Sequence, residues 1–137
     1  MSLPIEYTRV SLLANQSTKR QRTVQAQLIM VSSGTITVHL GRQALRLRPQ
    51  QILWLPHDCL HSIAAEQDAV VDALHFSARV TAALPQVSLQ CKNVPLLTAL
   101  IAELASDYDP QSNSTRRLLQ VCLDQVHKLA TNMPAKD

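Results

Sequence analysis

The sequence has few of the residues that mark several classes of protein. Only 3% of its 137 residues are aromatic, and no uninterrupted apolar run approaches the roughly 18 residues that span a bilayer. The three cysteines, Cys59, Cys91 and Cys122, are an odd number without C-x-x-C spacing, and no charged-then-apolar leader opens the chain. We therefore expect a protein of the reducing cytoplasm that does not associate with membranes.

The residues that are present suit one compact domain. With 46% apolar and 17% charged residues, the chain has the composition of a folded protein and the length of a single domain. Its net charge of +3 is uneven, because residues 1–61 carry seven Lys or Arg against two acids, whereas residues 62–137 carry six against eight. Aromatic residues do not interleave with the basic ones, which favours a solvated basic face over direct contact with nucleic acid.

Residues 7–77 show the period-two alternation of short β-strands. Residues 35–40 alternate polar and apolar, and residues 44–48 alternate again after a turn, which predicts a hairpin. The two glycines, Gly34 and Gly41, bracket the first strand of this hairpin and are assigned to turns. Further strands are predicted at residues 10–13, 24–31, 52–55, 61–65 and 69–77, and the set is typical of a sandwich or small barrel.

Beyond Pro85 the apolar period becomes helical. Pro95 stands at a first helical position, and leucine and isoleucine recur on one stripe of the helix that follows. Ser112 or Ser114 is placed to cap a second helix, whose apolar stripe continues to about residue 131. The predicted organisation is a barrel at residues 1–93, a two-helix antiparallel hairpin of the same domain at 94–131, and the start of a linker at 132–137.

The order of these motifs resembles the cupin fold, a jelly-roll β-barrel. The order is a strand, a turn at Gly34, a second strand, a turn at Pro49, a third strand and a Pro-x-x-x-x-His run from Pro56 to His61. Together with a helical pair that carries Asp107-Tyr108-Asp109-Pro110, residues 10–130 resemble the N-terminal regulatory half of AraC-type transcription regulators. The resemblance implies sensing of a small-molecule effector, a homodimer, and contact with DNA only through a helix-turn-helix half that is absent from this sequence.

In the metal-binding members of the cupin fold that this sequence resembles, the metal ligands form a pattern of His-x-His, a Glu and a later His. Counted back from Gly34, the two His places fall near Gln21 and Thr23 and the Glu place near Gln27, so His61 alone matches the set. A lone histidine does not hold a metal ion. We therefore predict no metal, no other cofactor and no catalytic residue, and we expect that the protein is not an enzyme.

Four residues are candidates for contact with an effector. His61 and His75 are placed to face the barrel interior, where they could contact a ligand. The more ordinary role of such a histidine is to donate a hydrogen bond to a backbone carbonyl. Trp54 offers a large apolar face either to a ligand or to the core, and Met30 is the fourth candidate. Cys59 lies in a loop between two histidines, where a thiol can be reactive, but no recognisable catalytic relay accompanies it.

The second helix carries a wider apolar stripe than packing on one barrel wall demands. Burial of one leucine side chain stabilises a protein by about 1.5 to 3 kcal/mol, so a surplus stripe favours association. We predict a homodimer through residues 114–130, with Leu119, Leu123 and Val126 as its contacts.

Two other functions stay open at this point. A small stand-alone cupin enzyme, such as an isomerase or a dioxygenase, would need a metal or an acid–base set that the sequence does not show. A scaffold that only dimerises, with a barrel filled by side chains, is not separated from an effector sensor by sequence.

Overall fold

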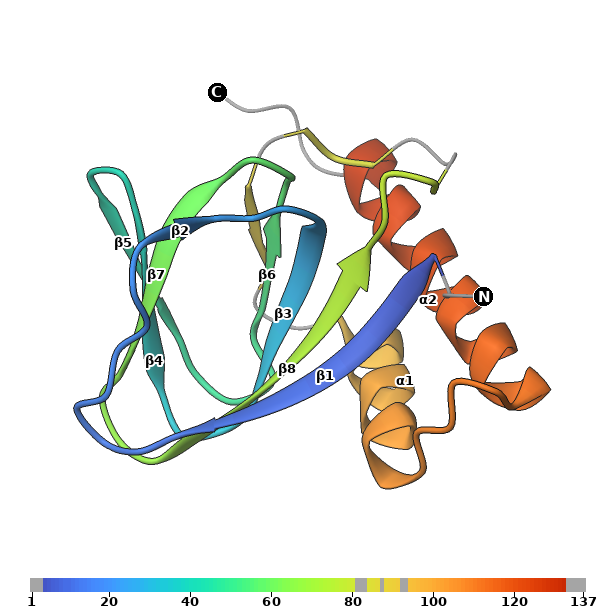
Figure 1. The fold of residues 1–137 in the computed structure, drawn as a ribbon, viewed down its shortest axis with the longest axis horizontal. Coiled ribbons are helices and arrows are strands. Elements are labelled where there is room, and N and C mark those ends of the chain that lie inside the picture. Colours follow the sequence, from blue (N-terminus) through green and yellow to red (C-terminus); the bar gives the residue numbers. More distant parts are fainter. Residues whose placement is uncertain (1–3, 81–83, 87, 92–93, 133–137) are drawn as a thin grey trace.

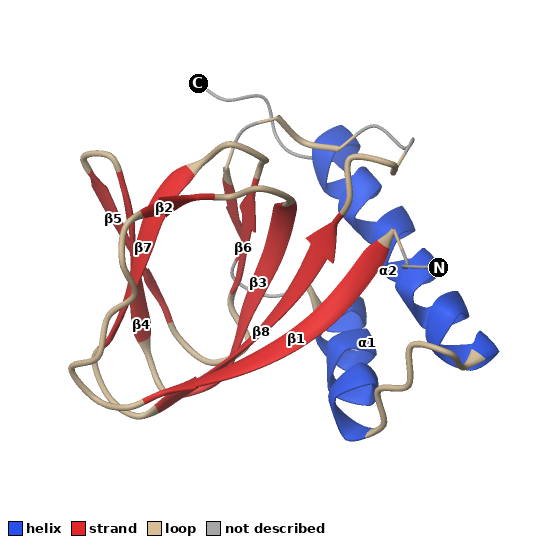
Figure 2. Cartoon of the chain, viewed as in Figure 1, coloured by secondary structure: helices blue, strands red, loops and turns tan. Residues whose placement is uncertain are grey.

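The computed structural model describes residues 4–80, 84–86, 88–91 and 94–132. Within them the chain forms nine strands followed by two helices (Figures 1 and 2). The strands are β1 Ile5–Leu12, β2 Gln21–Arg22, β3 Ala26–Ser33, β4 Ile36–Leu40, β5 Gln43–Leu47, β6 Ile52–Leu55, β7 Leu60–Ala65, β8 Ala69–Phe76 and β9 Leu89–Cys91. The helices are α1 Pro95–Ser106 and α2 Asn113–Asn132.

The strands form two antiparallel sheets that face each other. One sheet has the order β1-β8-β3-β6-β9, and the other has the order β2-β7-β4-β5. Both helices lie against the outer face of the five-stranded sheet, away from the four-stranded one (Figure 1). This arrangement confirms the predicted fold class of a β-barrel followed by two helices.

The five-stranded sheet separates two apolar cores. Side chains alternate across a strand, so Ile29 and Val31 of β3 point between the two sheets while Leu28 and Met30 point toward the helices. The core between the sheets also contains Leu53 and Leu55 of β6, whereas Trp54 of the same strand joins the helix-side core.

The clearest differences from the predicted elements concern β1, β2 and β9. β1 begins at Ile5, earlier than predicted, because the alternation of buried Ile5 and Tyr7 continues the strand toward the N-terminus. The short strands β2 and β9 were not predicted, since two or three residues are too few to show a period. The predicted linker lies outside the described residues except for Asn132, which ends α2.

Both helices begin where the sequence places them. Pro95 is the first residue of α1, where its missing N–H costs no hydrogen bond. Ser112 caps α2, because its Oγ accepts hydrogen bonds from the backbone N–H groups of Ser114 and Thr115, at 3.2 and 3.5 Å.

The apolar stripe of α2 faces the protein's own sheet. Leu119, Leu123 and Val126 are 3%, 8% and 0% exposed and belong to the helix-side core. The stripe is wide because it covers the five-stranded sheet and α1 together, whereas its width in the sequence predicted a surplus for association. The three side chains predicted to touch a second copy therefore pack inside one copy.

A buried carboxylate fixes β1 to the sheet. Asp72 of β8 is 0% exposed and accepts hydrogen bonds from the Tyr7 hydroxyl and from Arg9, whose Nε lies 2.8 Å from Oδ1. Ser32 donates a further hydrogen bond from a β-bulge in β3. Burial alone would raise the pKa of Asp72, but the donors from Arg9, Ser32 and Tyr7 outweigh it and hold that pKa below its usual value.

The same cluster changes the ionisation of its tyrosine. Burial, followed by the hydrogen bond to Asp72, raises the pKa of Tyr7 to about 12. The Tyr7 hydroxyl therefore stays protonated and remains a donor throughout the range in which proteins are ordinarily handled.

Asp72→Asn tests this cluster. A carboxylate whose folded pKa is depressed stabilises the fold above its unfolded pKa, near 4, and loses that stabilisation as the pH falls through the folded pKa. We expect the variant to lose about 2 kcal/mol of unfolding free energy at pH 7, because the hydrogen bonds from Arg9 and Ser32 lose their charged acceptor. Urea unfolding between pH 2 and 7 measures both the loss and its acid dependence, which should be smaller in the variant.

Asp124→Asn on the exposed side of α2 is the control for this experiment. A surface substitution of this kind is expected to change stability by no more than about 0.5 kcal/mol. Equal effects of the two substitutions would show that Asp72 is not a special anchor of β1.

Gly34 occupies a turn that admits no side chain. Its φ is +78°, and a Cβ at this position would press on the Asp68 carbonyl oxygen and lie 2.7 Å from Ala69 Cα. Gly41 also has a positive φ, +55°, but a Cβ there meets nothing within 4 Å. The two turn glycines thus share a conformation and differ in the space around them.

Gly34→Ala and Gly41→Ala separate these two effects. The alanine at position 41 adds only left-handed backbone strain, for which we expect a cost of about 1 kcal/mol. The alanine at position 34 adds a clash with backbone, and we expect a loss of about 4 kcal/mol or failure to fold. Urea midpoints of the two purified variants give the comparison, and similar midpoints would contradict it.

Candidate functional site

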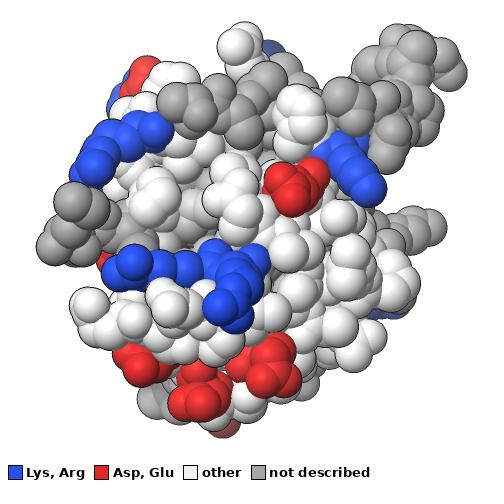
Figure 3. All heavy atoms as spheres, turned by 90° about the vertical axis from the view of Figure 1, so that its right-hand side faces the viewer, with Lys and Arg blue, Asp and Glu red and all other residues white. Residues whose placement is uncertain are grey.

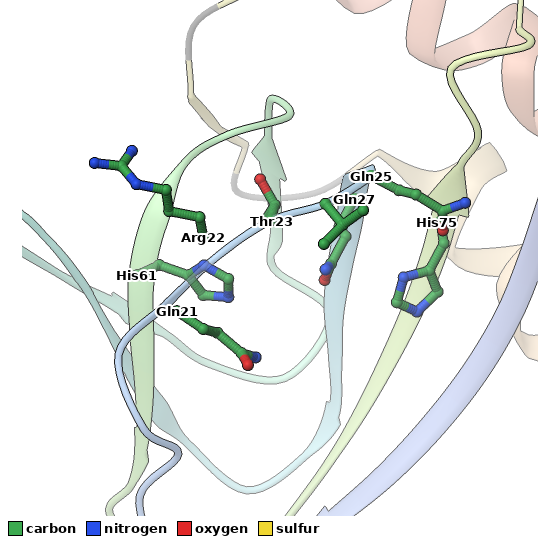
Figure 4. A pocket seen from close by; sticks show the side chains of 8 residues that line it. Gln21, Arg22, Thr23, Gln25, Gln27, His61 and His75 are labelled. Atoms are coloured by element: carbon green, nitrogen blue, oxygen red, sulfur yellow. The ribbon is translucent and has the colours of Figure 1, made fainter.

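A pocket opens at one end of the barrel, between the two sheets (Figure 4). Its volume is about 240 Å³, the space that about eight water molecules occupy in the liquid. Polar side chains predominate, with an exposed valine at the rim. The lining residues are Gln21, Arg22, Thr23, Val24, Gln25, Gln27, His61 and His75.

Each sheet contributes a glutamine–histidine pair to this pocket. Gln21 of β2 stands opposite His61 of β7 in the four-stranded sheet, and Gln27 of β3 stands opposite His75 of β8 in the five-stranded sheet. Residues directly opposite each other on antiparallel strands share a face, so each amide lies beside an imidazole. Figure 4 shows the two pairs on either side of the pocket.

His61 is oriented by the turn that precedes it. Its Nδ1 lies 3.2 Å from the backbone oxygen of Cys59, and the ring is 4% exposed. Because a carbonyl oxygen only accepts, Nδ1 carries the proton in this contact, and in the neutral ring Nε2 is left as an acceptor. The predicted bond from His61 to a backbone carbonyl is present, and the ring lines the pocket at the same time.

Thr23 lines the pocket and uses its hydroxyl for the fold. Its Oγ1 donates to the Pro56 carbonyl at 2.7 Å and accepts from the Cys59 N–H at 2.9 Å. Backbone hydrogen bonds from Thr23 to Cys59 and from Asp58 to Thr23 complete the contact. A cupin metal site would require a ligand here, whereas this threonine ties the segment before β3 to the turn after β6.

His75 connects the pocket to the edge strand of the sheet. Its Nε2 lies 2.8 Å from the Thr8 hydroxyl of β1. Burial lowers the pKa of His75, and the carboxylate of Glu6, directly opposite on β1, acts in the other direction. The net lowering favours the neutral imidazole, which has one donor and one acceptor nitrogen.

The four predicted ligand contacts divide into two groups. The structure brings His61 and His75 together in the pocket. Met30 and Trp54 point to the opposite face of the sheet, where Trp54 packs edge-on against Phe76 and donates to the Pro85 carbonyl at 2.8 Å. They do not reach the pocket, because even-numbered positions of β3 and β6 face the helices.

In the sequence, Gln21 and Gln27 were noticed as places where cupin ligands are missing. Gln21 and Gln27 stand where the count back from Gly34 put a histidine and a glutamate, and both do line the pocket. The alternation of β3 placed Gln27 on the polar face of its strand, and this signal was available. The role of Gln25, which lies outside any strand, had no such signal.

The arrangement offers hydrogen bonds but no recognisable metal centre. Among the described residues, no group of three or more His, Cys, Asp or Glu is placed to hold a metal ion. Burial raises the pKa of Cys59, so this thiol is held in its protonated, less nucleophilic form. Neither α1 nor α2, within the described part of the chain, is both long and apolar enough to cross a membrane.

Comparison with known families decides the affiliation of this domain. The model of the AraC-like ligand-binding domain matches residues 10–127, most of the chain. The chain belongs to this family. No curated protein matches it by sequence. The match begins within β1 and ends three quarters of the way along α2, so the AraC-like domain in this protein includes both the pocket and the helical layer.

Solved structures with a similar fold include whole-domain and barrel-only matches. Apo ToxT from Vibrio cholerae superposes with a TM-score of 0.73 at 10% identity, over 99% of this chain and 60% of that one. A cupin superfamily protein from Desulfitobacterium hafniense gives 0.53 at 17% identity, over 56% of this chain and 71% of that one. At these identities the similarity establishes the fold: a cupin barrel with a two-helix layer.

The ligand set of the pocket predicts the metal content of the AraC-like domain. Neutral amide and hydroxyl oxygens are weak ligands for transition metals, so two histidines are too few for a stable site. We expect elemental analysis of protein purified without chelator to give far less than one iron, zinc, nickel or manganese per chain. One equivalent of any of these metals that is lost on His61→Ala would contradict the expectation.

Proposed function

We propose that this chain is the effector-sensing regulatory domain of an AraC-type transcription regulator, and that the effector binds among the two glutamine–histidine pairs. The proposal rests on one observation, the convergence of Gln21, Gln27, His61 and His75 on a single pocket. An amide can donate and accept simultaneously, and a neutral imidazole does the same through its two nitrogens. Such a lining suits a small polar molecule rich in hydroxyl or amide groups.

The charge of the pocket narrows the class of effector. No carboxylate is among the described lining residues, and Arg22 at the rim is partly engaged by Asp58 at 3.5 Å. A cationic effector would find no anionic partner in this lining, so its desolvation would be uncompensated. We therefore propose an uncharged or weakly anionic molecule small enough for 240 Å³.

The regulatory output is proposed to pass through a homodimer and a DNA-binding half in the cytoplasm. Two observations support association through the helical layer. Leu96 of α1 and Val121 of α2 are 47% and 38% exposed, and much of the helix-bearing face is uncharged between separate groups of basic and acidic side chains (Figure 3). The absence of a continuous basic stripe on the described part of this face supports the view that DNA contact belongs to another part of the regulator.

Binding of an effector is tested by thermal unfolding of the AraC-like domain. Each member of a panel of monosaccharides, small amides and small carboxylates is added at millimolar concentration, and a ligand that binds only the folded state raises the Tm. We expect at least one member to do so, and Gln27→Leu to weaken its Kd about tenfold, because one hydrogen bond is lost and its partner is left unsatisfied.

Gln43→Leu is the matched control, because Gln43 is an exposed glutamine on β5, outside the pocket. It should leave the Kd unchanged. If no member of the panel shifts the Tm, or if both variants weaken binding equally, the pocket is not an effector site of this kind.

A further inference from the structure

β1 is an edge strand with contacts on three sides. Among the strands of the described residues it pairs only with β8, and none of them lies beside its other edge. On the pocket face, the Thr8 hydroxyl contacts His75 Nε2 at 2.8 Å. On the helix face, Tyr7 and Arg9 donate to the buried carboxylate of Asp72.

The open edge of β1 is covered by the loop between the two helices. The backbone N–H of Tyr7 donates to the Tyr108 hydroxyl at 3.3 Å, and the two rings meet edge to face with centroids 5.3 Å apart. Tyr108 lies between the end of α1 and the start of α2. A side chain of the helical layer thus satisfies an amide that an edge strand would otherwise leave to solvent.

Thr8 and Tyr7 are consecutive residues, so the pocket contact and the loop contact belong to one short piece of backbone. An edge strand can open locally by breaking one ladder only, and its opening would break both contacts together. We infer that Thr8 is a positioning residue for His75, and that β1 links the state of the pocket to the loop between α1 and α2. This inference rests on the proposed function, because it gives the effector a path to the helices.

The imidazole is suited to this link because its two nitrogens are coupled. Nε2 contacts Thr8, and Nδ1 is the other atom through which a molecule in the pocket would bond to the ring. An effector that fixes Nδ1 as donor or acceptor fixes the role of Nε2 toward Thr8 as well. A bound effector therefore orders the imidazole and closes β1 more firmly on β8. By reciprocity, a firmly closed β1 favours binding.

The link is tested in the free AraC-like domain by substitutions on the two faces of β1. Thr8→Val keeps the β-branched shape and removes the hydroxyl, and Tyr108→Phe removes the acceptor of the Tyr7 amide. Thr37→Val is the matched control, because Thr37 is a strand threonine whose hydroxyl donates to Glu66 at 3.0 Å, on the other sheet. Nitrogen NMR of the imidazoles and amide hydrogen exchange are recorded for each.

We expect Thr8→Val to shift the ring-nitrogen signals of His75 and to accelerate exchange of the amides at 6–9 about threefold to tenfold, the range for one hydrogen bond. Tyr108→Phe should accelerate the same amides and also move the His75 signals, although Tyr108 does not line the pocket. A merely structural role for Tyr108 would leave the imidazole unchanged.

Three results would overturn the inference: His75 signals in Thr8→Val that coincide with those of the parent, His75 signals in Tyr108→Phe that do so, or equal changes in Thr37→Val. The signals are assigned by their loss in His75→Gln. No effector is added, so the outcome is independent of the effector panel. If no panel member raises the Tm but the His75 signals shift, the link through β1 holds and the proposed effector does not. If a panel member raises the Tm but the His75 signals do not shift, the pocket binds an effector without the link through β1.

Discussion

The central strands of the five-stranded sheet, β3, β6 and β8, are buried on both faces, and the remaining elements are arranged around that constraint. One face packs against the four-stranded sheet and the other against α1 and α2. A strand of this kind cannot carry a polar face to water, which is why Ile52–Leu55 is apolar at every position. Polar side chains on these central strands must therefore be partnered within the protein or stand at the strand ends, and the pocket lies at such an end.

β8 shows both solutions within four residues. Asp72 faces the helices and is compensated by donors from Tyr7, Arg9 and Ser32, whereas His75 faces the pocket and keeps a nitrogen for other contacts. Asp72 is structural because both oxygens of its carboxylate accept hydrogen bonds from the protein. His75 has functional potential because its hydrogen-bonding capacity is incomplete. The number of hydrogen-bond partners thus separates Asp72, which anchors the sheet, from His75, which lines the pocket.

Much of the fold followed from local periodicity, and the main errors came from choices that periodicity does not decide. The hairpin around Gly41, the start of α1 at Pro95 and a serine cap at Ser112 or Ser114 are encoded in adjacent residues and were predicted, and the structure selects Ser112 as the cap. Continuous apolar runs such as Ile52–Leu55 give no indication of which side meets the lumen, so the sequence left Trp54 open between a ligand contact and the core, and the structure places it in the helix-side core. The stripe on α2 has the same sequence whether it meets a sheet or a second copy. The partners of Asp72 are distant in sequence and leave no local signal.

The position of the single tryptophan makes its fluorescence sensitive to one side of the five-stranded sheet and not to the other. Trp54 is completely buried between the sheet and the helices, in edge contact with Phe76 and bonded to the Pro85 carbonyl. The pocket is on the other side of the sheet, beyond the reach of the indole. The fluorescence of Trp54 will therefore change when the helical layer detaches. It will not change when a molecule merely enters the barrel. A change in tryptophan fluorescence on binding would mean that binding in the pocket had altered the packing on the helix side of the sheet.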